Sequence, residues 1–411
     1  MGNYLRTGTK DTIALETAQL RRQKVCQLKR DIPSDIECDI INEYIETPFG
    51  HILYVRRYIP KNNDKIKGIV FHAMGYGSFM DWTDYNNCME FVRRNYMVIQ
   101  HEHYGHGRSD GLWIYIKSFD ILTKTANYVH NKCKELYIKT LHDNEYERHP
   151  TYHVPWKDLR YIDNEKRYIL YGSSMGGALS IMLGYTYPND YKGIILMSPM
   201  TGIDDSVAPP KFLWNFLIWL AGHFGKKRWV PQGSQNIDNV ITSDKNAMDD
   251  HIENSALLWG NIQRLRTGLS LLRGVNSIHD NLSKVSIPFC VIHGNGDMVT
   301  SSKKSKEFYD GTINVNINDK ELHLVDSNYH HLLWEPCRDY VLKCCFGFCD
   351  KLLQLNDKND EIKINSGNID KQHHMSIYNN ALSPWGNDSN VSNNISTTDD
   401  ETTNIGASNI E

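Results

Sequence analysis

A Gly-x-Ser-x-Gly motif at residues 172–176, with Ser174 at its centre, is the stretch of this chain best suited to chemistry. A serine hydroxyl is a poor nucleophile until a base takes its proton, so it must stand clear of the backbone. A tight strand-to-helix turn presents the serine in this way. Such a turn crowds the backbone two residues before and after the serine, where glycine is needed. We therefore predict that Ser174, and not Ser173, is a nucleophile.

The residues on either side of the motif have the composition that this turn requires. Ile169 to Tyr171 is a short apolar run typical of a buried strand, and Ala178 to Tyr187 favours a helix. The first turn of that helix would point free N–H groups at the site, so the amide of Met175 is a candidate oxyanion donor. A Gly- and Ser-rich turn without chemistry is the alternative interpretation.

A second glycine-containing loop follows another apolar run. Gly68 to His72 is continuous and apolar, which is typical of a strand buried on both faces, and it leads into the sequence HAMGYGS. Glycines after a strand let the backbone approach a ligand, so the amide of Met74 is a second candidate oxyanion donor. The alternative is an ordinary glycine-rich loop.

An acid and a histidine follow the serine in the chain order that a hydrolytic triad requires. Asp297 lies in a glycine-containing loop after the apolar run Ile287 to His293, and His330 comes after the last predicted strand, Glu321 to Val325. In a mostly parallel sheet the catalytic groups gather at the carboxyl ends of the strands. We therefore expect both side chains near the serine.

These residues divide the chemistry between them. His330 would accept the proton of Ser174, and Asp297 would fix the tautomer and orientation of the imidazole. His331 or His323 could take the place of His330.

The remaining apolar runs predict a mostly parallel sheet covered by helices. An antiparallel hairpin, Ile40 to Thr47 and His51 to Ile59, opens the sheet. The other predicted strands are 68–72, 96–100, 169–171, 192–198, 287–293 and 321–325, with helices at 81–95, 111–137, 178–187, 302–309 and in a final stretch to 353.

The alternation of strands and helices stops between residues 201 and 282, where we expect a helical cap inserted between strands 6 and 7. The apolar residues of Lys211 to Phe224 surround the helix, and the run is shorter than the roughly twenty residues that span a bilayer. Candidate substrate contacts in it are Phe212, Trp214, Phe216, Leu217 and Trp219. Packing against the core is their alternative role.

Composition sets further limits. The net charge of -4 gives no basic surface for nucleic acid, so we expect no such partner. Nine scattered cysteines favour a reducing compartment, and the polar N-terminus lacks a signal peptide, so we expect a cytoplasmic protein, or one bound peripherally to membrane. Cys344, Cys345 and Cys349 are expected on the core face of the last helix, with palmitoylation as the alternative.

We expect no cofactor and no metal ion. His101, His103 and His106 lie close together, but no cysteine or carboxylate set completes a ligand shell around them, and glycines mark a turn there. The expected organisation is an N-terminal extension (1–38), a first core part (39–200), the cap (201–282), a second core part (283–355) and a disordered Asn-, Ser- and Thr-rich tail (356–411).

Taken together, the motifs resemble those of the α/β-hydrolases of the monoacylglycerol lipase and lysophospholipase group. The matching stretches are His72 to Gly75, Gly105 to Gly111, Gly172 to Gly177, Gly294 to Asp297 and Tyr329 to Leu332, and the likeness covers about residues 40–350. The Asn-rich tail and the polar stretch 141–164 look like those of malaria-parasite members. Two features depart from the group: Ala73 replaces the usual glycine, and the polar stretch is longer than usual.

The resemblance implies the triad Ser174, Asp297 and His330, the oxyanion donors Met74 and Met175, and a lipid-facing cap that could touch a membrane surface transiently. It implies a serine hydrolase that cleaves fatty acyl esters of a lysophospholipid or monoacylglycerol through an acyl-serine intermediate. A general carboxylesterase or an aminopeptidase on the same fold is the alternative, because a fold does not choose a substrate. A catalytically silent interaction protein is a third hypothesis.

Overall fold

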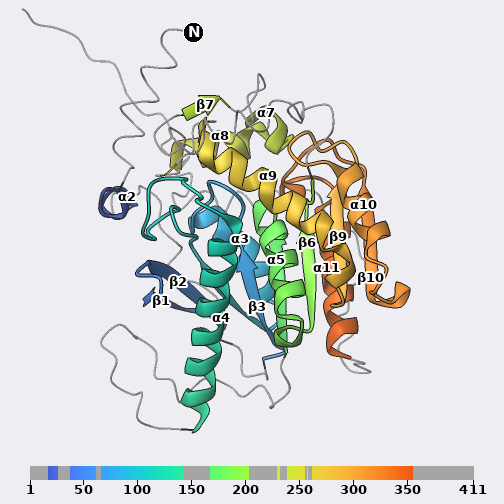
Figure 1. Cartoon of the computed structure of the whole chain (residues 1–411), viewed down its shortest axis with the longest axis horizontal. Helices are drawn as coiled ribbons and strands as arrows, with labels where there is room; N and C mark the ends of the chain where they lie inside the picture. The colour runs from blue at the N-terminus through green and yellow to red at the C-terminus, as the bar shows by residue number, and fades with distance from the viewer. Residues whose placement is uncertain are drawn as a thin grey trace, which may run out of the picture. The chain divides into compact units, whose positions relative to one another are not determined.

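A computed structural model describes residues 17–25, 38–61, 66–142, 167–202, 229–231, 238–254, 257 and 262–354. Its centre is an eight-stranded sheet with the order β1-β2-β4-β3-β5-β6-β9-β10 (Figure 1). The strands are β1 (Cys38–Glu46), β2 (Ile52–Pro60), β3 (Gly68–Ala73), β4 (Tyr96–His101), β5 (Tyr168–Ser173), β6 (Gly193–Met197), β9 (Phe289–Gly294) and β10 (Lys320–Val325). From β4 to β10 every pairing is parallel, as predicted.

The predicted hairpin at the edge of the sheet is confirmed. β1 and β2 pair antiparallel, and a turn closed by the N–H of Thr47 on the carbonyl of His51 (2.8 Å) joins them. Gly50 has a φ of 71°, a left-handed conformation that costs glycine little. β2 also pairs antiparallel with β4, which attaches the hairpin to the parallel part of the sheet.

Helices cover both faces of the sheet. α4 (Phe119–His142), α5 (Met175–Thr186), α9 (Leu265–Asp280) and α10 (Ser302–Gly311) pack on one face, and α3 (Trp82–Val92) and α11 (Arg338–Leu353) pack on the other (Figure 1). The remaining elements are α2 (Ala18–Val25), α7 (Asp238–Ile241), α8 (Lys245–Asn254), the small pair β7 (Trp229–Pro231) and β8 (Ile262–Arg264), and the 3-10 turns Pro188–Asp190, Leu282–Lys284, Ile317–Asp319 and Leu332–Trp334.

The two covered faces explain the continuous apolar runs of the central strands. In β3, Ile69 and Phe71 point into the core under α4 and α5, whereas Val70 points into the core under α3 and α11. In β9, Phe289 and Cys290 divide between the two cores in the same way. Successive side chains of a strand point to opposite faces, so a strand between two helical layers needs apolar residues at every position.

The helix predicted from residue 111 begins at Phe119, so its predicted start was wrong. Residues 102–118 instead form a tight loop with left-handed backbone at Gly105 (φ 82°), Gly107 (φ 50°) and Gly111 (φ 106°). The N–H of Ile114 donates to the carbonyl of Gly105 (2.7 Å) and closes this loop. Left-handed backbone at three glycines is incompatible with a helix. The backbone N–H and carbonyl of Gly105 form their hydrogen bonds within the loop instead.

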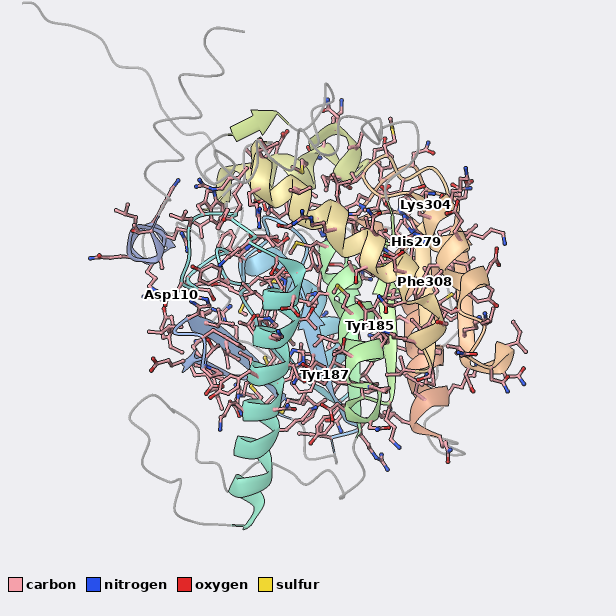
Figure 2. All side chains as sticks on the ribbon, viewed as in Figure 1. Asp110, Tyr185, Tyr187, His279, Lys304 and Phe308 are labelled. Atoms are coloured by element: carbon pink, nitrogen blue, oxygen red, sulfur yellow. The ribbon has the colours of Figure 1, made fainter. Side chains whose placement is uncertain are left out.

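α9 lies in the range predicted for the cap, yet it packs in the helical layer of the core. Ser277 on α9 lies 3.3 Å, Oγ to OH, from Tyr185 on α5, and Figure 2 shows Tyr185 and His279 on these two neighbouring helices. A Cβ on Gly274 would lie 2.7 Å from the ring of Phe119, so glycine permits the close contact with α4. The described part of the cap range is therefore attached firmly to the core at its C-terminal end.

Several predictions fall on residues outside the described ranges. These are Phe212, Trp214, Phe216, Leu217 and Trp219 of the cap, the polar stretch 143–164, and the tail from residue 356. In the described parts of the chain, none of the helices is both long and apolar enough to cross a membrane. Cys345 and Cys349 are buried on α11 as predicted, while Cys344 is partly exposed.

Five histidines are buried together behind the C-terminal ends of β3 and β4, namely His72, His101, His103, His106 and His130. Their rings pack closely: the centroids of His101 and His103 lie 5.0 Å apart, those of His103 and His106 5.8 Å. Burial lowers the pKa of His103 to about 4 and the pKa values of His72 and His106 to about 3. Burial also holds the pKa values of His101 and His130 well below their usual range. These imidazoles are therefore neutral in the folded protein.

This cluster predicts a loss of stability in mild acid. The unfolded chain binds a proton on each of these histidines below about pH 6.5 while the folded chain does not, so the free energy of unfolding falls as pH drops from about 6.5 towards 4. Each histidine adds up to about 1.4 kcal/mol per pH unit to this slope. Urea unfolding between pH 7.5 and 5 measures it, and His130→Gln should give a shallower slope. A free energy of unfolding independent of pH in this range would contradict the prediction.

Candidate active site

The predicted strand-to-helix turn at Ser174 is confirmed. Ser174 lies between the end of β5 and the first residue of α5, with φ 52° and ψ −121°. A non-glycine residue with positive φ is strained, and such strain is found where a side chain must be held in one place. Two hydrogen bonds hold this backbone: the N–H of Ser174 donates to Met197 (3.1 Å), and its carbonyl accepts from Met200 (2.9 Å).

The glycines of the motif are required by close backbone packing. A Cβ on Gly172 would lie 2.4 Å from the carbonyl oxygen of Gly176, and a Cβ on Gly176 would lie 1.9 Å from that of Ala73. No side chain fits at either distance. The turn at Ser174 and the loop after β3 are therefore pressed together without intervening side chains.

This contact brings the two candidate oxyanion donors to the same place. Met175 is the first residue of α5, where backbone N–H groups have no partner within the helix. Met74 follows β3, and its carbonyl lies 3.0 Å from Nε2 of His103. Ala73 pairs with Gly172 in the sheet, so the substitution of the usual glycine leaves the two loops starting side by side. That both amides bind an oxyanion stays a prediction.

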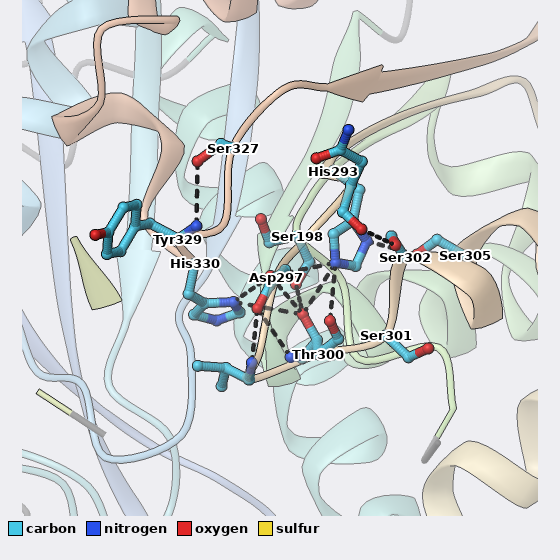
Figure 3. A network of polar contacts seen from close by, with 12 residues as sticks. Ser198, His293, Asp297, Thr300, Ser301, Ser302, Ser305, Ser327, Tyr329 and His330 are labelled. Carbon is cyan, nitrogen blue, oxygen red and sulfur yellow. Dashed lines mark hydrogen bonds and ion pairs between the residues drawn. The ribbon is translucent and has the colours of Figure 1, made fainter. Parts of the chain in front are cut away.

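Asp297 and His330 form a direct pair. Nδ1 of His330 lies 2.7 Å from Oδ2 of Asp297 (Figure 3). The other carboxylate oxygen, Oδ1, accepts the backbone N–H groups of Val299 (2.7 Å) and Thr300 (3.1 Å). The Asp297 side chain is fully buried, whereas 11% of the His330 side chain is exposed. The carboxylate of Asp297 is thus held by the backbone of its own loop, and one edge of the His330 imidazole stays accessible to solvent.

The surroundings keep Asp297 ionised. Burial raises the pKa of its carboxyl group, but the neighbouring charge of His330 and hydrogen bonds from His293 and His330 outweigh burial. The net effect holds the pKa well below the usual range of an aspartic acid. The permanent negative charge of Asp297 beside Nδ1 of His330 favours a proton on Nδ1, and thus an imidazole that accepts a proton at Nε2.

The other two candidate histidines lie elsewhere. The ring of His331 packs on Trp334, with centroids 4.3 Å apart, and burial lowers its pKa to about 3. His323 pairs with Glu321 on the same strand (3.1 Å). Of the three candidates, His330 is the one in contact with Asp297.

His293 is a member of this network that the sequence prediction missed. Its Nε2 lies 3.2 Å from Oδ2 of Asp297, and its Nδ1 lies 2.8 Å from Oγ of Ser305 (Figure 3). Thr300 adds a third contact, because its Oγ1 donates to Oδ2 at 3.0 Å. The available signal was a histidine inside a buried apolar strand, four residues before the acid.

The acid and the serine are connected across β6. Oγ1 of Thr300 lies 3.1 Å from the carbonyl oxygen of Ser198. The N–H of Ser174 donates to the carbonyl of Met197, the residue before Ser198. Ser174, Asp297 and His330 therefore follow the carboxyl ends of β5, β9 and β10 at one edge of the sheet. Proton transfer from Ser174 to His330 stays a prediction.

Potential metal ligands were also located. Within the described residues, Cys290, Glu321 and His323 are the one set of three such side chains whose ligand atoms lie within 4.8 Å of one another. Glu321 is already engaged by Lys351 (2.8 Å), and Cys290 and Glu321 are the second residues of β9 and β10, away from the strand ends that carry the candidate site.

The fold that carries these residues matches solved structures. A monoglyceride lipase from Saccharomyces cerevisiae in complex with a substrate analogue aligns with a TM-score of 0.58 over 79% of this chain and 99% of that protein, at 16% identity. A carboxyl esterase from Bacillus coagulans aligns with a TM-score of 0.57 over 76% of this chain and 99% of that protein, at 17% identity. The chain has the α/β-hydrolase fold.

Sequence comparison agrees with the fold. A family model described as serine aminopeptidase, S33, matches residues 154–337 of this chain. A caffeoylshikimate esterase from Arabidopsis thaliana is 27% identical over 71% of this chain and 78% of that protein. Human monoglyceride lipase is 23% identical over 69% of this chain and 81% of that protein. The resemblance to the monoacylglycerol lipase group is confirmed.

Substitution of the two adjacent serines tests the nucleophile. Ser174→Ala should abolish turnover and labelling by a fluorophosphonate probe, because the reacting oxygen is removed. Ser173→Ala is the matched control: Ser173 belongs to β5 and precedes the strained position, so we expect substantial activity to remain. Equal loss in both variants would show that the nucleophile is wrongly assigned.

Substitutions around the acid test the His330 assignment. Asp297→Asn should lower kcat on the order of 10⁴-fold, as for other triads, because an amide favours the wrong imidazole tautomer. His331→Ala should have a milder effect, since His331 has its own contacts with Trp334 and does not contact Asp297. An inactive His331→Ala variant with an active His330→Ala variant, in the same steady-state assay, would reverse the assignment.

Proposed function

We propose that this hydrolase cleaves fatty acyl esters of single-chain lipids, a lysophospholipid or a monoacylglycerol, through an acyl intermediate on Ser174. The observation that carries the proposal is the strained backbone of Ser174, pressed against the Met74 loop at the sheet edge that also holds the Asp297–His330 pair. This arrangement supports acyl transfer, because the proposed nucleophile, the proposed base and the loops of both candidate oxyanion amides are held before substrate arrives.

The proposed reaction has two halves. His330 takes the proton of Ser174 while the serine oxygen attacks the ester carbonyl, and the amides of Met74 and Met175 bind the resulting oxyanion. Collapse of this intermediate breaks the ester bond, and the leaving alcohol takes the proton from His330. Water then attacks the acyl-serine with His330 again as base, which releases the fatty acid and restores the serine.

The relatives named monoglyceride lipase support a lipid ester as substrate. We propose that the cap supplies the acyl-binding surface through Phe212, Trp214, Phe216, Leu217 and Trp219. Each methylene of an acyl chain buried there would gain about 0.8 kcal/mol, so long chains would be preferred. A cytoplasmic location with transient contact between the cap and a membrane surface would fit such a substrate.

A general carboxylesterase is the second candidate function. The caffeoylshikimate esterase relative is 27% identical to this chain, compared with 22% and 23% for the rat and human monoglyceride lipases. The name of that relative describes an ester without a fatty acyl chain. An aminopeptidase is a further possibility on this fold, in line with the description of the matching family model.

Acyl-chain dependence tests the lipid substrate. If the cap binds the acyl chain, Trp214→Ala or Trp219→Ala should lower kcat/KM for palmitate esters by one to two orders of magnitude, because about 1.5 to 3 kcal/mol of apolar contact is lost. Butyrate esters, too short to reach these rings, should react almost as before.

The matched comparison is the melting temperature of each variant. Equal loss for butyrate and palmitate esters, together with a lower melting temperature, would indicate that the tryptophans only stabilise the fold. Turnover of short esters and amino-acid amides in preference to monoglycerides and lysophospholipids would favour the second candidate function.

A further inference from the structure

The N-terminal helix α2 inserts a fully buried arginine into the loop that follows β4. Arg21 is 0% exposed, and its Nε donates to the carbonyl of Gly107 at 2.6 Å. Its Nη2 donates to the carbonyls of Ser109 (2.6 Å) and Gly111 (3.0 Å), and its guanidinium carbon lies 5.6 Å from the ring centroid of Trp113. Three carbonyls and one aromatic ring thus surround a single guanidinium.

The loop is shaped for this group. The left-handed backbone at Gly107 and Gly111 gives the chain the tight turns that direct successive carbonyls at one point. Arginine presents its N–H donors in a rigid planar fork, whereas lysine offers a single compact ammonium. A buried charge is costly unless it is hydrogen-bonded, so three carbonyl acceptors on one cation indicate a built site.

The neighbouring arginine has a different environment. Arg22 donates from Nε to the carbonyl of Arg108 (2.7 Å) and pairs with Asp110 (3.1 Å), and its side chain is 33% exposed. Figure 2 shows Asp110 beside α2. A partly exposed ion pair contributes less than a buried, fully bonded cation, so Arg22, on the same helix and the same turn, is a natural control for Arg21.

The loop held by Arg21 is connected to the candidate oxyanion donor. Its first residues include His103, whose Nε2 lies 3.0 Å from the carbonyl of Met74. Glu102 joins the two loops a second time, because its Oε1 accepts the N–H of Met80 (2.9 Å) and Nη1 of Arg108 (2.5 Å). The side chain of His103 and the bond between Glu102 and Met80 therefore both connect residues 102–111 to the loop after β3, and Arg108 holds Glu102 within its own loop.

The far end of the loop is fixed independently of α2. Nε of Arg264 donates to the carbonyl of Trp113 (3.0 Å), and Oγ1 of Thr267 donates to that of Ile114 (3.0 Å). Removal of Arg21 would consequently leave the carbonyls of Gly107, Ser109 and Gly111 without this donor, while residues 113–114 would stay attached to β8 and α9.

We propose that Arg21 is a positioning residue for the reaction. Its guanidinium holds the Gly107–Gly111 turn in the shape that keeps Glu102 and His103 against the loop of Met74, and so aims the Met74 amide at the developing oxyanion. This role rests on the proposed function. It assigns helix α2 to the active-site scaffold.

Kinetics of the full-length chain test the proposal. Arg21→Ala should lower kcat about ten- to a hundredfold with little change in KM, less than the loss of a whole oxyanion donor, because the donor is misplaced and not removed. Arg22→Ala should stay within about twofold of wild type, as expected for an exposed pair. Rates are normalised to the fraction of protein labelled by a fluorophosphonate, so unfolded protein does not count.

Chemical rescue separates positioning from general stability. Guanidinium or ethylguanidinium at low millimolar concentration should restore kcat of Arg21→Ala in a saturable manner. The free cation fits the space left between the carbonyls of Gly107, Ser109 and Gly111. The same salts should leave wild type and Arg22→Ala unchanged. If Arg21→Ala does not fold, Arg21→Lys is compared with wild type instead, because lysine keeps the positive charge and lacks the planar set of N–H donors.

A lower melting temperature with wild-type kcat per labelled site, or an activity loss that no guanidinium salt reverses, would overturn the positioning role. An inactive wild type would instead overturn the proposed function, so the two failures are distinguishable.

Discussion

The absence of space between Gly176 and Ala73 is the constraint on which the site depends. The backbone of the first turn of α5 touches the carbonyl at the end of β3, and even a methyl group at residue 176 would collide with it. The strand pairing already places Ala73 opposite Gly172. This contact therefore sets how close α5 lies to the end of β3, and it sets the path of the Met74 loop. The position of Ser174 follows, since it is the residue between β5 and α5.

The acid half of the site depends on a different set of bonds. Asp297 receives donors from its own loop, from His293 in β9 and from His330, so its carboxylate has little freedom to turn. Thr300 then attaches the loop to the end of β6, next to the residue that binds the Ser174 amide. β6 thus sets the distance between Ser174 and the Asp297 loop. The position of β6 in the sheet is set by packing on both faces.

Much of this arrangement could be predicted from local sequence. The apolar runs of β3 and β9 indicated strands buried on both faces, and the glycines at 172 and 176 indicated the turn. What could not be predicted depends on partners far along the chain. Carbonyls of the loop at residues 102–118 are bound by Arg21, more than eighty residues earlier in the chain. His293 was missed because a histidine in an apolar strand carries no local sign of the carboxylate that it meets.

Because α7 supports the backbone of His330, the segment between β6 and α9 cannot be exchanged freely among related proteins. The N–H groups of His330 and His331 donate to the carbonyls of Val240 (3.1 Å) and Ile241 (2.8 Å), so the backbone of the proposed base leans on a helix from the inserted segment. Both ends of that segment are anchored, at Gly202 against Lys304 and at α9 against α5, so its length is free to vary between them. A transplanted segment would nevertheless have to bring two main-chain acceptors to the same place. Chimeras designed only to alter specificity would otherwise disturb the general base, and they would lose turnover for every substrate at once.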